Sequence, residues 1–394
     1  MLTSSMRMLP GHKYLLELYQ CWQKRSKMCW EVCRMQQKGF WPTLALGSIA
    51  MLTAFPASGI LSRLYFQDGG QRRWLVAWTA VAGWPLTAFA LVPFYLQKDT
   101  LPTRPTWGLL LSYAVLGLLS AADNLMYSWA YSYMPLSTAS LVAASTLIFT
   151  AFFARCLIGK RLNAFTINAI GVITAGTVIL ALDSSSDRPT GVTRSQYAVG
   201  FILDIAASAL HGLIFALSEL VFIRLLGRES THVILEQQTM VSFFGFVFTT
   251  IGVLKNGDFS AMKSESKRFL LGPTAYFMVI IWSAISYQVG VLGSVAILYC
   301  ASTLLAGVLN SVRVPITSIA AVIFLDDPMN GFKVLSLFLT AWGFVSYVYG
   351  GFKDEQSCKK GINNSQRRYN DETVEDLRYP EVGQELSPDS YNRI

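Results

Sequence analysis

The chain has 394 residues, of which 53% are hydrophobic and only 14% are charged. Soluble domains carry about 25% charged residues, so this composition excludes a water-soluble globular protein, a coiled coil and a disordered chain. The net charge of +8 depends largely on residues 1–40, which contain 7 Lys and Arg but only 2 acidic residues. Basic charge beside apolar segments is typical of the cytosolic side of a membrane and not of a surface that binds nucleic acid.

Apolar runs long enough to cross a bilayer core of about 30 Å recur along the chain. They predict ten membrane-spanning helices at residues 41–61, 74–96, 107–131, 136–158, 165–181, 197–223, 233–254, 276–293, 295–324 and 334–350. Only Gly290 and Gly293 mark the joint between the eighth and ninth runs. We therefore expect an all-α polytopic membrane protein, with both termini on one side because the number of spans is even.

The ten spans predict three parts of the chain. Residues 1–40 form a basic N-terminal tail, residues 41–352 a transporter domain, and residues 353–394 a polar C-terminal tail. Counting Lys and Arg places both tails in the cytosol, although the internal loops alone do not favour this orientation. The plasma membrane is the expected location.

Two stretches of the chain resemble each other at a constant offset of 167 residues. Asn163-Ala164-Phe165 corresponds to Asn330-Gly331-Phe332, and Gly176 corresponds to Gly343. The chain therefore reads as two five-helix repeats, residues 41–182 and 196–352. Because five is an odd number, the second repeat is inverted, which is typical of secondary transporters with a binding site near the membrane midplane.

Charged side chains inside apolar spans need a partner, a cavity or a function. Asp123, Asp204 and Arg313 lie at similar predicted depths on three helices, so they form a candidate charge cluster. Either the acidic residues only neutralise Arg313, or one of them binds a proton or the substrate. Glu219 and Glu236, near the cytosolic ends of the sixth and seventh spans, are further proton-coupling candidates, although simple pairing with nearby arginines explains them as well.

Aromatic and amide side chains accompany these charges. Flat ligands are held by stacking and a few fixed hydrogen bonds, so such a mixture suits an aromatic heterocycle. Trp84 precedes a proline in the middle of the second span, and His211 lies near the middle of the sixth, where ordinary packing is the simpler interpretation. The other residues of this kind are Asn124, Tyr127, Trp282, Tyr287 and Gln288.

Motifs for enzymatic chemistry are absent from the sequence. There is no P-loop, no G-x-S-x-G and no H-E-x-x-H, and the six cysteines form no C-x-x-C pair. We therefore expect neither an enzyme nor an ATP-driven pump, and no metal or cofactor.

Several strings resemble motifs of the plant purine permeases, within the drug/metabolite transporter superfamily. They are residues 118–128 (LLSAADNLMYS), 136–141 (LSTASL), 184–193 (SSSDRPTGVT), 329–334 (MNGFKV) and 342–347 (WGFVSY). The resemblance runs from about residue 41 to 350. It implies ten helices in two inverted repeats and proton-coupled uptake of adenine-like purines and cytokinins, with alkaloids or pyridoxine as cargo of some members.

Family residues carried over by position are Trp84, Asp123, Tyr127, Ser140, Glu219, Glu236, Trp282 and Gln288. This chain departs from the family pattern at Thr146, Tyr287 and His211, where Gln, Trp and Tyr are common, and it has charges at Asp204 and Arg313. The first three departures lie at substrate-binding positions, so the choice of substrate is open.

The sequence thus predicts a proton-coupled importer of purine bases and derivatives, cytokinins included, embedded in a lipid bilayer. The expected substrate-binding residues are Trp84, Asp123, Asn124, Tyr127, Ser140, Thr146, His211, Trp282, Tyr287 and Gln288, and the expected proton-coupling residues are Asp123, Glu219 and Glu236. The alternatives are a carrier of other aromatic heterocycles, a nucleotide-sugar exchanger and a non-transporting membrane receptor.

Overall fold

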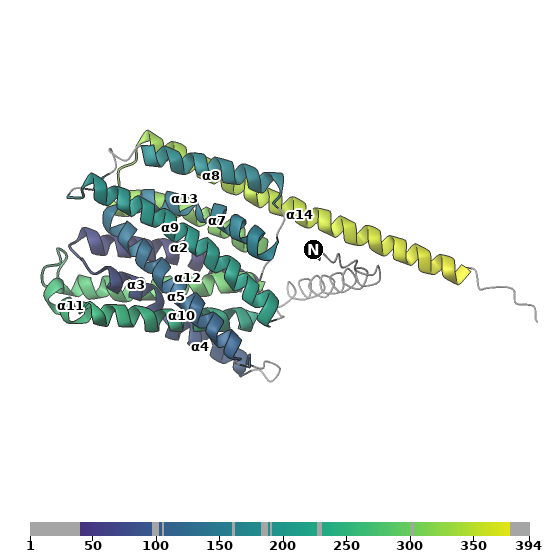
Figure 1. Cartoon of the computed structure of the whole chain (residues 1–394), viewed down its shortest axis with the longest axis horizontal. Helices are drawn as coiled ribbons and strands as arrows, with labels where there is room; N and C mark the ends of the chain where they lie inside the picture. Colours follow the sequence, from purple (N-terminus) through teal and green to yellow (C-terminus); the bar gives the residue numbers. More distant parts are fainter. Residues whose placement is uncertain are drawn as a thin grey trace, which may run out of the picture. The chain divides into compact units, whose positions relative to one another are not determined.

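The computed structural model describes residues 40–96, 102–104, 106–159, 162–182, 188–189, 191–226, 231–300 and 303–378, and every regular element in these ranges is a helix (Figure 1). The all-α prediction is therefore confirmed for this part of the chain. Residues 30–350 form one compact unit, and residues 1–29 with 351–394 form another. The predicted N-terminal tail lies outside the described residues up to residue 39.

The helices follow one another with short connections. Their bounds are α2 (Phe40–Gln67), α3 (Arg73–Ala82), α4 (Trp84–Tyr95), α5 (Trp107–Tyr133), α6 (Leu136–Ala143), α7 (Thr146–Phe153), η1 (Ala154–Ile158), α8 (Ala164–Leu182), α9 (Arg194–Val221), η2 (Phe222–Leu226), α10 (Thr231–Lys255), α11 (Asp258–Ser266), α12 (Pro273–Cys300), α13 (Thr303–Leu325) and α14 (Gly331–Arg378).

Nine stretches among the described residues are long and apolar enough to cross a membrane. They are Trp41–Gln67, Arg73–Tyr95, Trp107–Tyr133, Leu136–Ile158, Ala164–Leu182, Arg194–Leu226, His232–Lys255, Pro273–Ile297 and Gly331–Lys353, and a shorter apolar stretch, Val312–Leu325, belongs to α13. Large apolar side chains such as Trp41, Phe89 and Phe338 are exposed on these helices, as expected where lipid covers a protein. The chain is therefore a multi-pass membrane protein.

The second predicted span consists of two helices, α3 and α4, which meet at Gly83. A Cβ atom at Gly83 would lie 2.4 Å from Cγ of Gln288 on α12, so only glycine allows this close crossing. The Gln288 side chain donates from Nε2 to the Ala80 carbonyl at 3.0 Å. Gln288 thus satisfies a backbone acceptor beside the helix break.

The joint predicted at Gly290 and Gly293 is wrong, because α12 continues through both glycines to Cys300 and α13 begins at Thr303. These glycines serve packing instead. A Cβ atom at Gly293 would lie 2.7 Å from the Gly47 carbonyl oxygen, and one at Gly290 would lie 2.8 Å from the Phe55 ring. The two glycines therefore allow α2 and α12 to approach each other closely.

Helices α8 and α14 pack antiparallel through reciprocal contacts. A Cβ atom at Gly176 of α8 would lie 3.3 Å from Oγ of Ser336, and one at Gly343 of α14 would lie 3.3 Å from the Ala169 carbonyl. Ala169 and Ser336 are themselves 167 residues apart, as are the two glycines. The antiparallel direction follows because Phe165, near the start of α8, contacts Tyr349.

The two matching asparagines also have the same local role. Oδ1 of Asn163 accepts from the Thr166 backbone at 2.6 Å, and Oδ1 of Asn330 accepts from the Lys333 backbone at 2.9 Å. Each asparagine thus caps the helix that follows it. Helix α14 continues to Arg378, so the first part of the predicted C-terminal tail is helical, and residues 379–394 lie outside the described residues.

Candidate functional site

A hydrogen-bonded acid–imidazole pair joins α5 to α9. Oδ2 of Asp123 lies 2.7 Å from Nδ1 of His211. The Asp123 side chain is 4% exposed and that of His211 is 28% exposed. The two groups form an ion pair whenever the imidazole is protonated, so this contact can hold a proton between two spans.

Aromatic rings and hydroxyls surround the pair. Tyr127 lies one turn after Asp123, and its ring is 6.3 Å from that of His211. It also stacks against Tyr131 at 6.0 Å, and its hydroxyl lies 3.4 Å from Oγ of Ser208 on α9. Residues three or four positions apart share one face of a helix, so these side chains of α5 and α9 lie on the faces by which the two helices contact each other.

Asp204 lies on α9 one turn before Ser208 and is completely buried. Neither of its oxygens has a hydrogen-bond partner among the described residues, and the same is true of Oδ1 of Asp123. The two carboxylates are close enough to interact electrostatically. Three buried carboxylate oxygens in this part of the protein therefore lack a donor among the described residues.

Arg313 of α13 lies against aromatic groups. Its guanidinium carbon lies 4.7 Å from the ring centroid of Phe55, and that ring contacts Tyr287 edge-on at 5.6 Å. All the charges concerned lie in the described part of the chain, yet no ion pair joins Arg313 to Asp204 or Asp123. A cation–π contact thus takes the place of the salt bridge that the sequence suggested as one possibility.

Arg313 also lies within electrostatic range of the phenol groups of Tyr127, Tyr131 and Tyr287. Tyr131 is in turn within range of both acids. We call the following seven residues the midspan cluster: Asp123, Tyr127, Tyr131, Asp204, His211, Tyr287 and Arg313.

Tyr131 belongs to this cluster although the sequence did not single it out. Arg63, also missed, is buried on α2 and donates to the Tyr131 carbonyl at 2.7 Å. The apolar run ends at residue 61 in the sequence, whereas α2 continues to Gln67. No single apolar face is distinct along α2, so the sequence carried no clear signal for the burial of Arg63.

Three of the predicted substrate-binding residues lie outside the midspan cluster. Trp84 packs against Phe243 and Phe246 of α10, with ring centroids 5.2 and 6.4 Å away. Gln288 is buried beside the α3–α4 break, with its Oε1 unpartnered among the described residues. Trp282 is 53% exposed on the outer surface of α12, so the structure does not bring it to the midspan cluster.

The remaining predicted polar residues also make local contacts. Ser140 donates to the Ser137 carbonyl at 3.0 Å, and the Thr146 carbonyl accepts from the Thr150 hydroxyl at 2.8 Å. Thr146 begins α7, directly after the turn that interrupts the fourth span. Asn124 is half-buried and has no hydrogen-bond partner in the described part of the chain.

Glu236 of α10 has a separate polar environment. Its carboxylate accepts from the Tyr95 hydroxyl at 2.6 Å, from the Thr103 backbone at 3.3 Å and from the Thr103 hydroxyl. These contacts tie α10 to α4 and to the segment before α5. Glu219 is half-buried near the end of α9. Neither acid is part of the midspan cluster.

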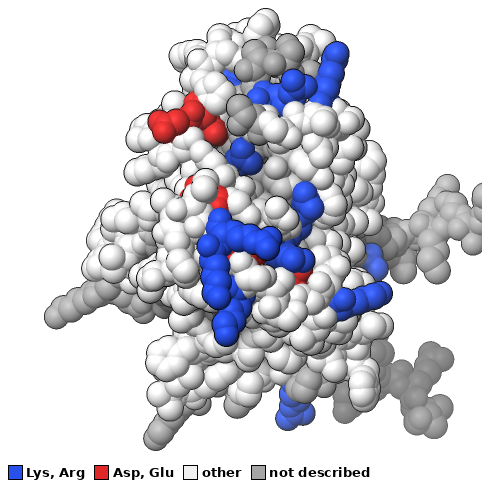
Figure 2. All heavy atoms as spheres, turned by 90° about the vertical axis from the view of Figure 1, so that its left-hand side faces the viewer, with Lys and Arg blue, Asp and Glu red and all other residues white. Residues whose placement is uncertain are grey.

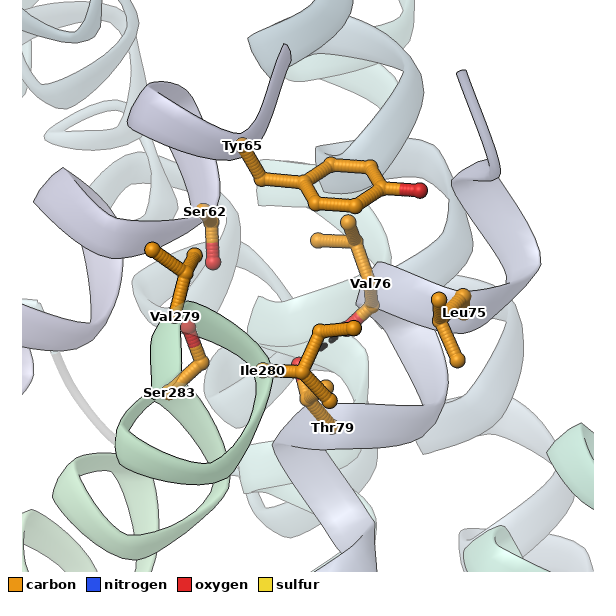
Figure 3. Close-up of a pocket in the computed structure, with 8 residues that line it drawn as sticks. All are labelled: Ser62, Tyr65, Leu75, Val76, Thr79, Val279, Ile280 and Ser283. Atoms are coloured by element: carbon orange, nitrogen blue, oxygen red, sulfur yellow. Dashed lines mark hydrogen bonds between the residues drawn. The ribbon is translucent and has the colours of Figure 1, made fainter. Parts of the chain in front are cut away.

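A small cavity lies between α2, α3 and α12, lined by Ser62, Tyr65, Leu75, Val76, Thr79, Val279, Ile280 and Ser283 (Figure 3). Its volume of about 10 Å³ admits about one water molecule, so it is not a site for a purine. Within the described ranges, no group of three His, Cys, Asp or Glu residues could hold a metal ion.

Lys and Arg side chains gather on the face at the α11 end of residues 30–350 (Figure 2). Two acids of α11 lie at this end, Asp258, which is buried, and Glu265, which is partly buried. Oε2 of Glu265 accepts from the hydroxyls of Tyr65 and Tyr276 at 2.9 and 2.7 Å, and Asp258 pairs with Arg72 at 3.5 Å. These contacts fix α11, which the sequence did not predict, against α2 and α12.

The apolar spans define a multi-pass membrane protein in which a polar, aromatic cluster lies between the helices. A family model described as purine nucleobase transmembrane transport matches residues 42–357. Probable purine permease 5 of Arabidopsis thaliana is 55% identical over 325 residues, which cover 82% of this chain and 90% of that protein.

Purine permeases 2 and 3 of the same plant are 35% and 33% identical over 319 and 311 residues. Each alignment covers 76% of this chain, and 89% and 88% of the respective relatives. The chain belongs to the plant purine permease family. It is accordingly a transporter of purine nucleobases across a membrane and not an enzyme.

Proposed function

We propose that this protein couples the import of purine bases and their derivatives, cytokinin bases included, to the entry of protons. The observation that carries the proposal is the 2.7 Å contact between Asp123 and His211. A carboxylate and an imidazole that share a hydrogen bond inside a span can take up a proton from one side and release it to the other.

Proton binding at this pair changes the charge of the midspan cluster. With His211 protonated, the pair is neutral overall, whereas its loss of a proton leaves the Asp123 charge uncompensated. Such a change shifts the balance between conformations that open to opposite sides of the membrane. Glu219 and Glu236 remain proposed proton carriers, but the three hydrogen bonds at Glu236 favour a structural role for that carboxylate.

Stacking is the proposed basis of purine binding. The rings of Tyr127, Tyr131 and Tyr287 belong to the same midspan cluster as the acid–imidazole pair, and Asn124 adds an unpartnered amide on α5. A flat base can stack on such rings while its edge bonds to Asp123, His211 or Asn124. We keep Trp84, Ser140, Thr146 and Gln288 as more distant candidates, and the exposed position of Trp282 does not support a contact with substrate.

We also propose ten spans in two inverted repeats, with α13 as the ninth. The reciprocal contacts of Gly176 and Gly343 support this arrangement, because a twofold axis in the membrane plane relates equivalent positions of antiparallel helices. The basic N-terminal tail supports cytosolic termini, and the plasma membrane is the proposed location.

Uptake of labelled adenine and trans-zeatin into yeast cells that lack purine uptake tests the function. We expect uptake to be faster in acidic medium, to collapse with a protonophore, and to lose its pH dependence in Asp123→Asn. Asp68→Asn, which changes an acid outside the spans, is the matched control. Protonophore-insensitive uptake would contradict proton coupling.

A carrier of other aromatic heterocycles is the second candidate, because the imidazole of His211 is hydrogen-bonded within the cluster and can bond to ligands other than adenine. Competition of labelled adenine with pyridoxine and with alkaloids separates the two candidates. A nucleotide-sugar exchanger would instead be inhibited by nucleoside diphosphates, and a receptor would bind ligand without flux in proteoliposomes.

A further inference from the structure

Asp204 is a buried acid that has no role in the proposed proton coupling. It is completely buried, and neither carboxylate oxygen has a hydrogen-bond partner in the described part of the chain. Asp204, Ser208 and His211 are spaced by four and three residues, so they share one face of α9. Since Ser208 contacts Tyr127 and His211 contacts Asp123, this face is directed at the midspan cluster.

Among the described residues, no ion pair joins Asp204 to a cation. The groups of α5 within electrostatic range of Asp204 are the Asp123 carboxylate and the phenols of Tyr127 and Tyr131. His211, which belongs to α9 like Asp204, is hydrogen-bonded to Asp123, and Arg313 of α13 lies over the Phe55 ring. A buried carboxylate in such surroundings requires a proton, a cation or hydrogen-bond donors from elsewhere.

The unpartnered oxygens provide acceptors for donors that a bound ligand would supply. Three buried oxygens, two on Asp204 and Oδ1 of Asp123, lack a donor in the described part of the chain. Two nearby donors are already engaged, since Nδ1 of His211 contacts Asp123 and the Tyr127 hydroxyl contacts Ser208. The three unpartnered oxygens are thus complementary to a ligand whose edge carries N–H groups.

We propose that Asp204 determines specificity by accepting a hydrogen bond from the 6-amino group of the purine. This inference rests on the proposed function, because it assumes that the base binds in the midspan cluster. A 6-oxopurine would place its carbonyl oxygen against the carboxylate, which leaves buried acceptors facing each other and is strongly unfavourable. N6-substituted adenines are accepted as long as one N–H remains.

Competition against labelled adenine in the same yeast cells tests the inference with four unlabelled compounds. In the wild type we expect adenine and N6-methyladenine to compete well. Hypoxanthine and N6,N6-dimethyladenine, which present no N–H at position 6, should be weaker by about tenfold or more. In Asp204→Asn the amide can donate to a carbonyl, so the preference for adenine over hypoxanthine should fall by about tenfold or more.

Asp204→Glu, which keeps the carboxylate, should retain the wild-type order, and so should the control Asp68→Asn. An unchanged adenine-to-hypoxanthine ratio in Asp204→Asn overturns the inference, even if the stoichiometry of protons to adenine changes. If Asp204→Asn does not reach the membrane, equal competition by N6-methyladenine and N6,N6-dimethyladenine in the wild type overturns it. Absence of any adenine uptake by the wild type would instead refute the proposed function itself.

Discussion

Lys333, at the start of α14, donates a hydrogen bond from Nζ to the hydroxyl of Ser137 on α6 at 2.8 Å. The ammonium also donates to the Pro328 carbonyl at 2.7 Å, and the Lys333 side chain is almost completely buried. The Ser137 backbone in turn donates to Asp327 at 2.9 Å. One buried lysine therefore joins the beginning of α6 to the connection between α13 and α14.

Replacement of Lys333 tests the stability of this junction. Lys333→Met keeps the length and the apolar stem but leaves the Ser137 hydroxyl and the Pro328 carbonyl without their donor. Since hydrogen bonds to charged groups contribute about 1.5–3 kcal/mol, we expect a clearly lower melting temperature of the detergent-purified protein. Lys263→Met, at an exposed position of α11, is the control and should melt like the wild type. Equal melting of all three proteins would contradict the structural role.

Two glycines of α5 should respond oppositely to the same substitution. A Cβ atom at Gly117 would lie 2.5 Å from Cβ of Phe244 and 3.0 Å from the Val241 carbonyl on α10, whereas Gly108 has nothing within 4 Å. Gly117→Ala should destabilise by about 1–3 kcal/mol through overpacking. Gly108→Ala should be neutral or stabilising by up to about 1 kcal/mol, because alanine favours helix. Thermal unfolding of both variants checks the difference, and a tolerated Gly117→Ala would show that α5 and α10 are not so close.

Asp258, at the start of α11, should make the stability of the protein depend on pH. Burial raises the pKa of Asp258, Arg72 lowers it in part, and Glu265 raises it. A raised pKa means that the folded form binds the proton more tightly than the unfolded form. This contribution is therefore complete below the unfolded pKa and is lost as the pH rises through the folded one.

Asp258→Asn, which cannot ionise, should accordingly gain stability relative to the wild type as the pH is raised from acidic to neutral. We expect a gain of a few tenths to about 1 kcal/mol, because the Arg72 partner is partly exposed and screened. Melting temperatures across this pH range check the result, with Asp258→Glu as the variant that keeps the acid. A loss of stability in Asp258→Asn over this pH range would mean that the favourable pairing of Asp258 with Arg72 outweighs the unfavourable burial of its carboxylate.

Most spans were predictable from the sequence, because a bilayer requires long apolar helices and nearly every long apolar run in the chain belongs to one. The wrong joint at Gly290 and Gly293 has a simple cause. Glycine reads as an interruption along the chain, but in α12 it permits contact with α2 through Gly47 and Phe55. The use of a glycine depends on the neighbouring helix, which a single sequence does not reveal.

The site was predictable in part for a related reason. A charge inside an apolar run is conspicuous, so Asp123, Asp204 and Arg313 could be found without knowing any contact. The partners could not, since the Asp123–His211 contact spans 88 residues and His211 alone suggested ordinary packing. Exposure of Trp282 likewise depends on the rotation of α12, which its sequence leaves undetermined because apolar residues occur on all sides of the helix.

The environment of Glu236 predicts different outcomes for the two roles considered for that acid. If its carboxylate mainly ties α10 to α4, Glu236→Gln and Tyr95→Phe should both lower uptake of adenine at every pH without shifting the pH profile. We expect this result, because an amide cannot accept as many hydrogen bonds as the carboxylate does. Asp123→Asn should instead flatten the profile. A flattened profile in Glu236→Gln would identify Glu236 as a proton carrier.

The reciprocal packing of α8 and α14 predicts coupled effects of its two glycines. Gly343→Leu should be destabilising, because even a Cβ atom there would lie 2.6 Å from Cγ1 of Ile173. Gly176→Leu should also be destabilising, though less so, since its nearest neighbour would be 3.3 Å away. Gly171→Leu, at a position of α8 with nothing within 4 Å, is the control.

Because both glycines open the same interface, the double variant should lose less stability than the sum of the single losses. Melting temperatures of the four variants measure this coupling. Strictly additive losses would mean that the two positions act on separate contacts, and the proposed twofold relation between the halves would then lose its structural support.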